Sequence, residues 1–273
     1  MICLTYNNAS GRLNNITMEK ISIKSYNALI KDAEMLTNDR YGDKVLKLKD
    51  GRIVKLFRLK RFLSSALLWP YAKRFIRGIR ILEKFNIPTV KSADLFTVPS
   101  IKRDIVIYQP LEGESLRDLI KQANDPSELI FGFAKFFASL HKKGIYFRAI
   151  HFNNVFITPS NEFGLIDIAD LYYSPLPMTI SKRVRNFKPI FHYKEDREAL
   201  ESLSLDKFLD IYCRNSNFMS ERKKIHFKKK YFLQYRDSKG FAGPYPTPAL
   251  VNSHQKRTIG RLSGNNKRTL PVS

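Results

Sequence analysis

Alternating apolar and polar residues predict a sheet in the N-terminal part of the chain. Residues 44–59 read KVLKLKDGRIVKLFRL, two alternating runs joined at Asp50-Gly51, a pattern typical of a β-hairpin. A second pair of strands is expected upstream. Helical spacing of apolar residues then predicts a helix over 65–85, which ends before Ile87-Pro88. The apolar positions of this helix are Leu68, Ala72, Phe75, Ile79 and Leu82.

Farther along the chain the pattern indicates helices separated by short strands. A short apolar strand is expected at 105–110, and Ser115 is suited to cap the start of a helix. A long helix is predicted over 126–143, with Gly144 at its end, because its apolar residues share one face. Short strands follow at 145–149, 155–158 and 163–168, and a helical pattern runs from Asp196 to about Tyr212. From Ser238 onward, polar and basic residues without apolar periodicity predict a disordered tail.

The composition fits a folded protein in a reducing compartment. Of the 273 residues, 43% are hydrophobic and 12% aromatic, enough for a large core. The two cysteines, Cys3 and Cys213, are too few and too far apart for a disulfide framework or a CxxC metal site. The N-terminus shows no secretory signal, and the longest apolar stretches are shorter than a membrane span. We therefore expect a cytoplasmic protein that can lie on a membrane surface.

The formal net charge of +23 indicates a polyanionic partner, either nucleic acid, anionic lipid or phosphorylated glycolipid. The basic residues gather at 40–84 and 222–268; one such run is often a solvated face, but two favour a partner. Basic and aromatic residues interleave at 228–235, yet no nucleic-acid-binding motif accompanies them, which makes nucleic acid the least favoured partner. We expect the run at 222–230 to bind anionic surfaces, and truncation after Asn217 to leave the melting temperature nearly unchanged.

Three polar residues follow one another in the order that kinase-type phosphoryl transfer requires. Lys55 lies in the second strand of the hairpin, as the phosphate-pairing lysine of the V-A-I-K strand does. Asn154 lies in a loop and Asp167 at a strand end, and their oxygens suit Mg²⁺, which takes few protein ligands beside nucleotide phosphates. Each residue alone is ordinary, but their joint order predicts that they meet in one cleft. It also predicts ATP and Mg²⁺ as cofactors.

Two segments resemble a known family. LHKKGIYFRAIHFNNV at 140–155 and GLIDIAD at 164–170 resemble the catalytic and metal-binding loops of the lipopolysaccharide kinase family, which includes core heptose and Kdo kinases and toluene tolerance proteins. The resemblance spans roughly 39–212 and includes DRYG at 39–42 and RNF at 185–187. It implies an α+β, protein-kinase-like fold of two lobes. The N-lobe would comprise 39–108 and the helical C-lobe 109–237, with an N-terminal extension and first strands at 1–38 and a basic tail at 238–273.

The resemblance also implies roles for individual residues. Lys55 and Gly42 would bind the nucleotide phosphates, and Tyr108 to Leu111 would form the hinge against which adenine stacks. Arg148 would be the arginine of the H-R-D motif, and Asn154 and Asp167 the metal ligands. The implied activity is phosphorylation of lipopolysaccharide inner-core sugars on the cytoplasmic face of the inner membrane of a Gram-negative bacterium. The basic zones would then face anionic lipid or phosphorylated sugar.

The motifs depart from the kinase pattern at three places. Ala149 occupies the position of the catalytic aspartate of H-R-D, and an alanine cannot accept a proton. His151 or Asp170 are the candidates to replace that base; the alternatives are a loop histidine bonded to the backbone and a cap or turn aspartate. Residues 38–43 contain one glycine where G-x-G-x-x-G has three, and the only carboxylate on the helix after Lys55 is Glu83, at its far end. A weak kinase and a catalytically silent kinase-fold protein that binds glycolipid or a partner enzyme therefore both stay open.

Overall fold

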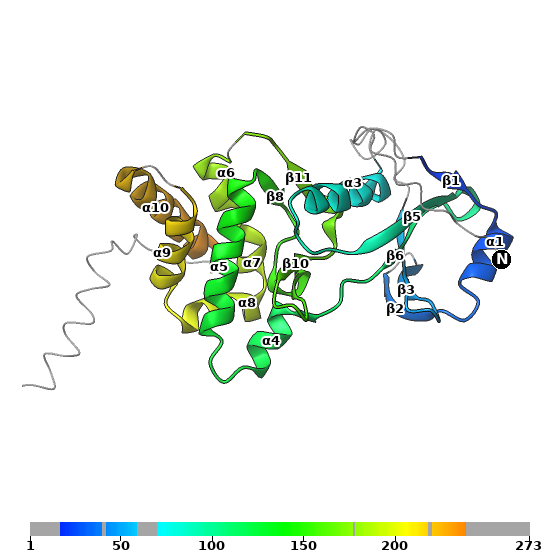
Figure 1. Cartoon of the computed structure of the whole chain (residues 1–273), viewed down its shortest axis with the longest axis horizontal. Helices are drawn as coiled ribbons and strands as arrows, with labels where there is room; N and C mark the ends of the chain where they lie inside the picture. The colour runs from blue at the N-terminus through cyan, green and yellow to red at the C-terminus, as the bar shows by residue number, and fades with distance from the viewer. Residues whose placement is uncertain (1–16, 40–41, 59–69, 177, 218–219, 239–273) are drawn as a thin grey trace, which may run out of the picture.

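The structure, a computed structural model, describes residues 17–39, 42–58, 70–176, 178–217 and 220–238. It is an α+β protein, with a six-stranded sheet at one end and a mainly helical part at the other (Figure 1). The tail predicted from Ser238 onward lies, apart from Ser238 itself, outside the described residues. The same holds for Leu68 and the predicted start of the helix at 65–69.

The sheet has the strand order β1-β5-β6-β4-β3-β2, and its neighbours are antiparallel except for β1 beside β5. Its strands are β1 (Glu19–Lys20), β2 (Glu34–Asp39), β3 (Gly42–Lys47), β4 (Ile53–Arg58), β5 (Lys91–Val98) and β6 (Arg103–Gln109). The hairpin predicted from the alternating runs is β3–β4. Gly51 adopts φ +84 in its turn, and the Asp50 carboxylate accepts the backbone N–H of Arg52 at 3.0 Å.

The sheet separates two hydrophobic clusters because successive side chains of a strand point to opposite faces. Val54 and Leu56 of β4 face the cluster that contains Tyr26 of α1 (Ile23–Leu29). Lys55, between them, is in register with Val106, which belongs to the other cluster on the side of α3 (Tyr71–Lys84). The alternation of β4 thus directs Lys55 toward α3.

The helix α3 confirms the predicted periodicity. Ala72, Phe75, Ile79 and Leu82 are all buried, as the spacing requires for one face against a core. The helix ends at Lys84, and Asn86 adopts φ +51 before Ile87-Pro88. This turn leads directly into β5 of the sheet.

The helical part contains several short elements between longer helices. Its helices are α4 (Leu116–Gln122), α5 (Ser127–Lys142), α6 (Ile180–Arg185), α7 (Lys188–His192), α8 (Lys194–Ser202), α9 (Leu205–Asn215) and α10 (Glu221–Ser238). Its strands are β7 (Glu114–Ser115), β8 (Ile145–Phe147), β9 (Val155–Ile157), β10 (Phe163–Leu165) and β11 (Leu171–Tyr173). Short 3₁₀ turns lie at η1 (Pro99–Ile101), η2 (Phe152–Asn154) and η3 (Ile168–Asp170).

Local signals in the sequence account for several boundaries of these elements. The Ser115 hydroxyl caps α4 by accepting the Asp118 N–H at 3.1 Å, and Gly144, at φ +77, follows the end of α5. The helical pattern predicted from Asp196 to Tyr212 is confirmed as two helices, α8 and α9. Ser204, between them, adopts φ +73.

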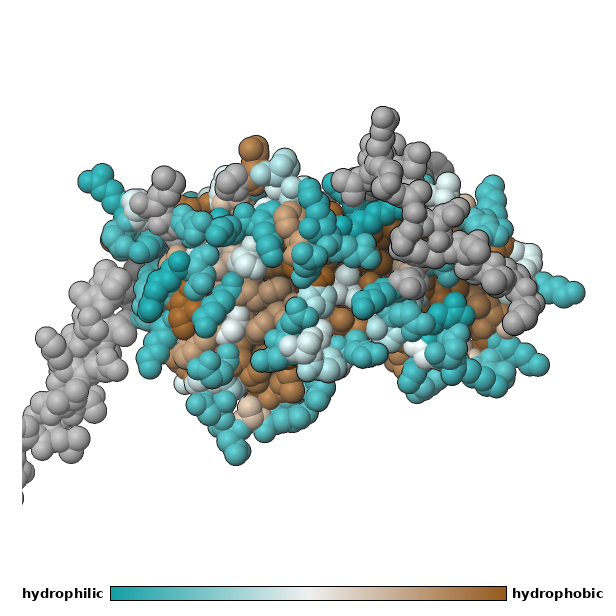
Figure 2. Space-filling view, viewed as in Figure 1, coloured by the Kyte–Doolittle hydropathy of each residue, from teal (hydrophilic) through white to brown (hydrophobic). Residues whose placement is uncertain are grey.

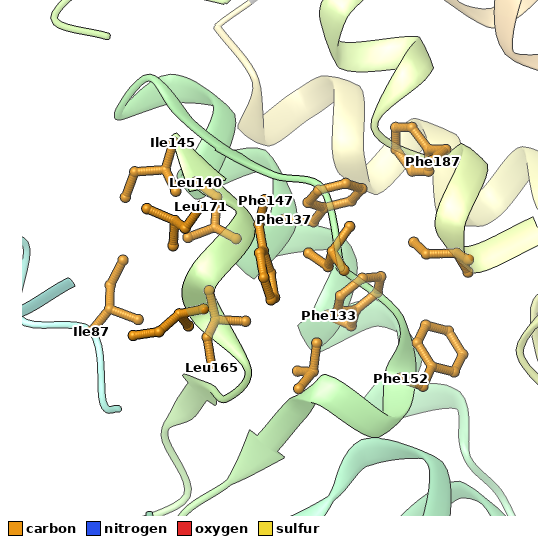
Figure 3. Close-up of a cluster of buried hydrophobic side chains, with 14 of the residues drawn as sticks. Ile87, Phe133, Phe137, Leu140, Ile145, Phe147, Phe152, Leu165, Leu171 and Phe187 are labelled. Atoms are coloured by element: carbon orange, nitrogen blue, oxygen red, sulfur yellow. The ribbon is translucent and has the colours of Figure 1, made fainter. Parts of the chain in front are cut away.

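Aromatic side chains fill the core of the helical part. The Phe133 ring lies 5.4 Å from that of Phe137 and 5.1 Å from that of Phe152, and Figure 3 shows these three rings close together. In α10, Phe227 and Tyr231 are fully buried in the same cluster. The expectation that truncation after Asn217 leaves stability unchanged is therefore wrong, because it would remove part of the core.

Hydrophilic residues cover much of the face seen in Figure 2, with hydrophobic residues showing between them over the helical part. Within the described ranges, no helix has both the length and the apolar character needed to cross a membrane.

Candidate functional site

Lys55 and Asp167 meet between the sheet and the helical part. The Lys55 Nζ lies 2.5 Å from Oδ1 of Asp167, and the ammonium is 5.7 Å from the ring centres of Phe57 and Phe75. The lysine side chain is 9% exposed, whereas the aspartate side chain is 46% exposed. The carboxylate is thus held by a buried cation on one side and is open to solvent on the other.

A backbone hydrogen bond brings the segments of Asn154 and Asp167 together. The Asn154 carbonyl accepts the N–H of Ile166 at 3.1 Å, so the two candidate metal ligands lie on adjacent segments. The Asn154 side chain is buried and donates from Nδ2 to the Ala149 carbonyl at 2.9 Å, so its side-chain oxygen is the atom that could hold a metal. Asp167 adopts the left-handed conformation, φ 53 and ψ 44, immediately before η3.

This pair of oxygen donors fits Mg²⁺. The ion commonly takes one or two protein oxygens and completes its shell with nucleotide phosphates and water. Among the described residues, no group of three or more His, Cys, Asp and Glu side chains could hold a metal ion. The arrangement therefore suits a metal that arrives with a phosphate ligand, and gives no second candidate site built from these side chains.

The position opposite Lys55 on α3 is apolar. Phe75 lies there, and Glu83 is exposed near the end of the helix. Lys55 thus has no acidic partner on α3, as the sequence indicated, and pairs with Asp167 instead. Kinases place a lysine–glutamate pair at the corresponding helix when active.

Of the candidate nucleotide-binding residues, the structure brings Tyr108 close to this pair. Tyr108 of β6 has its ring 5.1 Å from that of Phe75, and burial, with a smaller effect of the Asp167 charge, raises the pKa of its hydroxyl. Leu111 packs against Gly164, where a Cβ atom would lie only 2.6 Å from Leu111 Cδ2. Gly42 begins β3 with φ +105, opposite Asp39, and residues 40–41 of this hairpin tip lie outside the described ranges.

His151, within the candidate catalytic loop, is half-buried, with its ring 4.4 Å from that of Tyr193. Burial lowers the pKa of His151, and Arg117 lowers it further, while Asp196 and Asp167 act in the opposite direction. The imidazole is therefore neutral at pH 7 and can accept a proton. Its Nδ1 is buried and has no hydrogen-bond partner in the described part of the chain, which does not favour a histidine bonded to the backbone.

Asp170 and Arg148 lie together at the end of β8 and β11. The Asp170 carbonyl accepts the Arg148 N–H at 3.1 Å, and Oδ1 of Asp170 is buried without a partner among the described residues. A hydrogen bond to Tyr172, and then the charge of Asp170, raise the pKa of Arg148. Arg148 is exposed and lines a pocket that Lys55, Asn154 and Asp167 do not line. Of the candidate catalytic residues, Arg148 thus belongs to a different pocket from the lysine–aspartate pair.

Two buried polar clusters that the sequence did not indicate hold the loop in place. Asp196 is fully buried and accepts the Phe152 N–H at 2.8 Å and Nε of Arg117 at 2.7 Å, which ties α8 and α4 to the loop. The second cluster joins His141 to Tyr212 and Asn186 at 2.5 and 3.1 Å, and the Asn186 amide donates to the Phe147 carbonyl at 2.7 Å.

The sequence carries only a weak signal for these clusters, since His141 directly follows the apolar residues of its helix but also precedes Lys142 and Lys143. Comparison of the chain with models of protein families and with curated proteins finds no match. The family resemblance accordingly rests on the motifs quoted above.

Proposed function

We propose that this chain is an ATP-dependent phosphotransferase with a two-lobed, protein-kinase-like fold that phosphorylates inner-core sugars of lipopolysaccharide. The observation that carries the proposal is the contact between Lys55 and Asp167 at 2.5 Å, because phosphoryl transfer needs a cation and a metal ligand on either side of the phosphates. Asn154, one hydrogen bond from the residue before Asp167, adds the second metal ligand.

The order of the elements supports a kinase-like fold. In protein kinases the phosphate-pairing lysine lies on the third strand, ahead of helix αC. Lys55 lies on β4, the third strand of the β2-β3-β4 meander, and α3 follows it in the chain. Asn154 and Asp167 then flank β9 and β10, in the order of the kinase catalytic and metal-binding loops.

Each side chain has a definite task in this proposal. Lys55 binds and orients the nucleotide phosphates, and Asp167 and Asn154 hold Mg²⁺, which neutralises the charge that develops on the transferred group. His151, neutral at pH 7, accepts the proton of the acceptor hydroxyl in place of the missing aspartate. Phe57 and Phe75 exclude water from one side of the lysine. In the proposal the chain acts at the cytoplasmic face of the inner membrane, where the acceptor glycolipid is made.

The test is transfer of labelled phosphate from ATP to deep-rough lipopolysaccharide in the presence of Mg²⁺. Wild type should label the acceptor, and Asp167→Ala should abolish labelling because it removes the metal-binding carboxylate. An Asp206→Ala variant, at an aspartate on α9 away from these residues, serves as the control and should keep activity. Equal labelling by wild type and Asp167→Ala would contradict the proposed site.

A second function, a silent kinase-fold protein that binds glycolipid or a partner enzyme, is favoured by one observation. Ala149 occupies the catalytic position and Phe75 stands where an acidic partner of Lys55 is expected. Thermal denaturation with and without ATP and Mg²⁺ separates the two functions. A nucleotide-dependent rise of the melting temperature together with labelling supports the enzyme, and the absence of both supports the silent protein.

A further inference from the structure

A basic pocket that the lysine–aspartate pair does not line is formed by residues of the paired strands β8 and β11 and of the helices α6 and α7. Figure 1 shows where these elements lie. The volume of the pocket is about 880 Å³, within the range of pockets that hold small organic ligands, roughly 300–1,000 Å³. Arg148, Lys182, Arg185, Lys188 and His192 line it, and no Asp or Glu does so in the described part of the chain. The described lining is thus positively charged and contains no carboxylate, and the charge of Asp170, which does not line the pocket, acts on Arg148.

The fold fixes this charge in place. In α6, in α7 and between them, Val184, Phe187, Ile190 and Phe191 are buried in the core. Residues on the opposite side of the same two helices, Lys182, Arg185 and Lys188, are exposed and point toward the pocket. Among the described residues, none of these three has a carboxylate within ion-pair distance of 4 Å. Their charge is available to a ligand.

The opposite wall is aromatic. Tyr146 of β8 and Tyr172 of β11 are directly paired across the two strands, so their side chains share one face. Arg148, two residues after Tyr146, continues that face and bonds to Tyr172. The wall therefore offers ring surfaces, phenol hydroxyls and a guanidinium together, which suits a sugar ring that bears an anionic group.

We propose that this pocket binds the phosphate groups of a phosphorylated saccharide. A phosphate monoester carries nearly two negative charges and three acceptor oxygens, and Arg and Lys bind such groups through charge-assisted hydrogen bonds. Several uncompensated cations exceed what one sugar carboxylate can neutralise, which favours phosphate over carboxylate as the group bound. Arg148, which lines the pocket, lies three residues before His151 in the chain, so one short segment carries both a pocket residue and the candidate base. The identity of that saccharide as lipopolysaccharide core rests on the proposed function.

The test is calorimetric titration with the oligosaccharide obtained by deacylating deep-rough lipopolysaccharide. The same oligosaccharide after enzymatic dephosphorylation keeps its sugar acids and isolates the contribution of phosphate; inorganic phosphate is the third probe. Wild type should bind the phosphorylated form about tenfold or more tightly than either other probe. Equal affinity for the phosphorylated and the dephosphorylated oligosaccharide would refute the role of phosphate. Equal affinity for the phosphorylated oligosaccharide and inorganic phosphate would refute the role of the saccharide.

The variant for this test is Lys182→Gln with Arg185→Gln, which removes two pocket charges from exposed positions and should not disturb folding. Its matched control is Lys24→Gln with Lys31→Gln, an equal charge loss in and just after α1, at the other end of the molecule (Figure 1). The pocket variant should bind the phosphorylated oligosaccharide about tenfold less tightly, and the control as tightly as wild type. Equal weakening in both would mean a general charge effect and overturn the pocket.

The outcome is separable from that of the proposed function. The rise of melting temperature with ATP and Mg²⁺ depends on Lys55 and Asp167, which the pocket variant leaves unchanged. Saccharide binding that is lost in the pocket variant while the nucleotide effect persists supports the pocket. If the protein binds ATP and Mg²⁺ but none of the saccharide probes, the proposed role of the pocket is refuted and the proposed function is not. If it binds the phosphorylated oligosaccharide but shows no rise of melting temperature with ATP and Mg²⁺, the role of the pocket is supported and the proposed kinase function is refuted.

Discussion

Gly78 of α3 lies directly against Ile168, the residue after Asp167: a Cβ atom on Gly78 would stand 2.8 Å from the Ile168 carbonyl oxygen. Real Cβ atoms do not approach so closely, so the helix and the segment that carries the aspartate touch through their backbones. Because the neighbour is backbone, a side chain at position 78 can be accommodated only if one of the two moves.

We expect Gly78→Ala to lower the free energy of unfolding by about 1–3 kcal/mol, although alanine favours a helix interior by about 1 kcal/mol over glycine. Gly132→Ala in α5 is the matched control, because its new Cβ would meet Cζ at the tip of the Phe163 ring at 2.9 Å, and that half-buried side chain can shift. Urea denaturation of both variants measures the difference. A Gly78→Ala protein as stable as Gly132→Ala would contradict the backbone contact between α3 and Ile168.

Lys55→Met should separate stability from nucleotide binding. Methionine matches the length of the lysine stem and suits the surroundings of Phe57 and Phe75, so we expect the free energy of unfolding to change by less than about 1.5 kcal/mol. The rise of melting temperature with ATP and Mg²⁺ should disappear, because the cation that pairs with the phosphates is gone. Lys47→Met, at an exposed position of β3, is the control and should keep the rise. Retention of the full nucleotide effect by Lys55→Met would refute the assigned role.

Local signals in the sequence were sufficient to predict the elements that depend on residues close to one another in the chain. The β3–β4 hairpin follows from alternation and from Asp50-Gly51, and the start of α4 from Ser115. The meeting of Lys55 and Asp167 was expected from the order of the motifs rather than from any local pattern, since 112 residues separate them. Motif order thus carried information about distant contacts that periodicity does not contain.

The sequence did not predict the elements that are stabilised mainly by residues far away in the chain. The strand β5 was not predicted, because Asp94 interrupts its apolar run and a register shift follows Lys91. The sequence of α10 indicated only a basic run. Its apolar pattern is weak because, of its residues, only Phe227 and Tyr231 are fully buried. The anchoring of the catalytic loop by Asp196 depends on an Arg117 that lies 79 residues away.

The base in catalysis can be identified with two substitutions. If His151 accepts the proton of the sugar hydroxyl, His151→Ala should lower turnover by about 10²–10⁴-fold and leave the nucleotide-induced rise of melting temperature unchanged. Ala149→Asp, which restores the aspartate of the kinase motif, should raise turnover. His226→Ala, at an exposed position of α10, is the control. A His151→Ala enzyme with wild-type turnover would return His151 to a structural role and direct attention to Asp170.

The helix α10 should prove essential for stability. Phe227→Ala removes a fully buried ring that lies 5.0 Å from that of Tyr212, and we expect a loss of about 3–5 kcal/mol. Ile225→Ala, at a position 64% exposed on the same helix, should change stability by less than about 0.5 kcal/mol. Urea denaturation distinguishes the two, and truncation after Asn217 should lower the melting temperature sharply. A truncated chain that melts with wild type would mean that α10 does not contribute to the core.

His141 should make the protein less stable in mild acid. The side chain is fully buried between Tyr212 and Asn186, and burial lowers the pKa of His141 from 6.5 to about 3. Between these two values the unfolded chain binds a proton at this residue and the folded chain does not, so stability rises with pH. From this residue alone we expect the free energy of unfolding at pH 5.5 to be about 1.4 kcal/mol lower than at pH 8.

Two variants and one spectroscopic measurement test this dependence. His141→Gln should be less stable than wild type at pH 8, because it disturbs a buried hydrogen-bonded group, yet its stability should fall less between pH 8 and 5.5. His226→Gln, at an exposed histidine, should keep the wild-type profile. In wild type, the NMR signals of the His141 ring should not titrate between pH 8 and 5. Titration of that ring near pH 6.5, or equal pH profiles for His141→Gln and wild type, would show that the histidine charges in the folded state and contributes nothing to the loss of stability in acid.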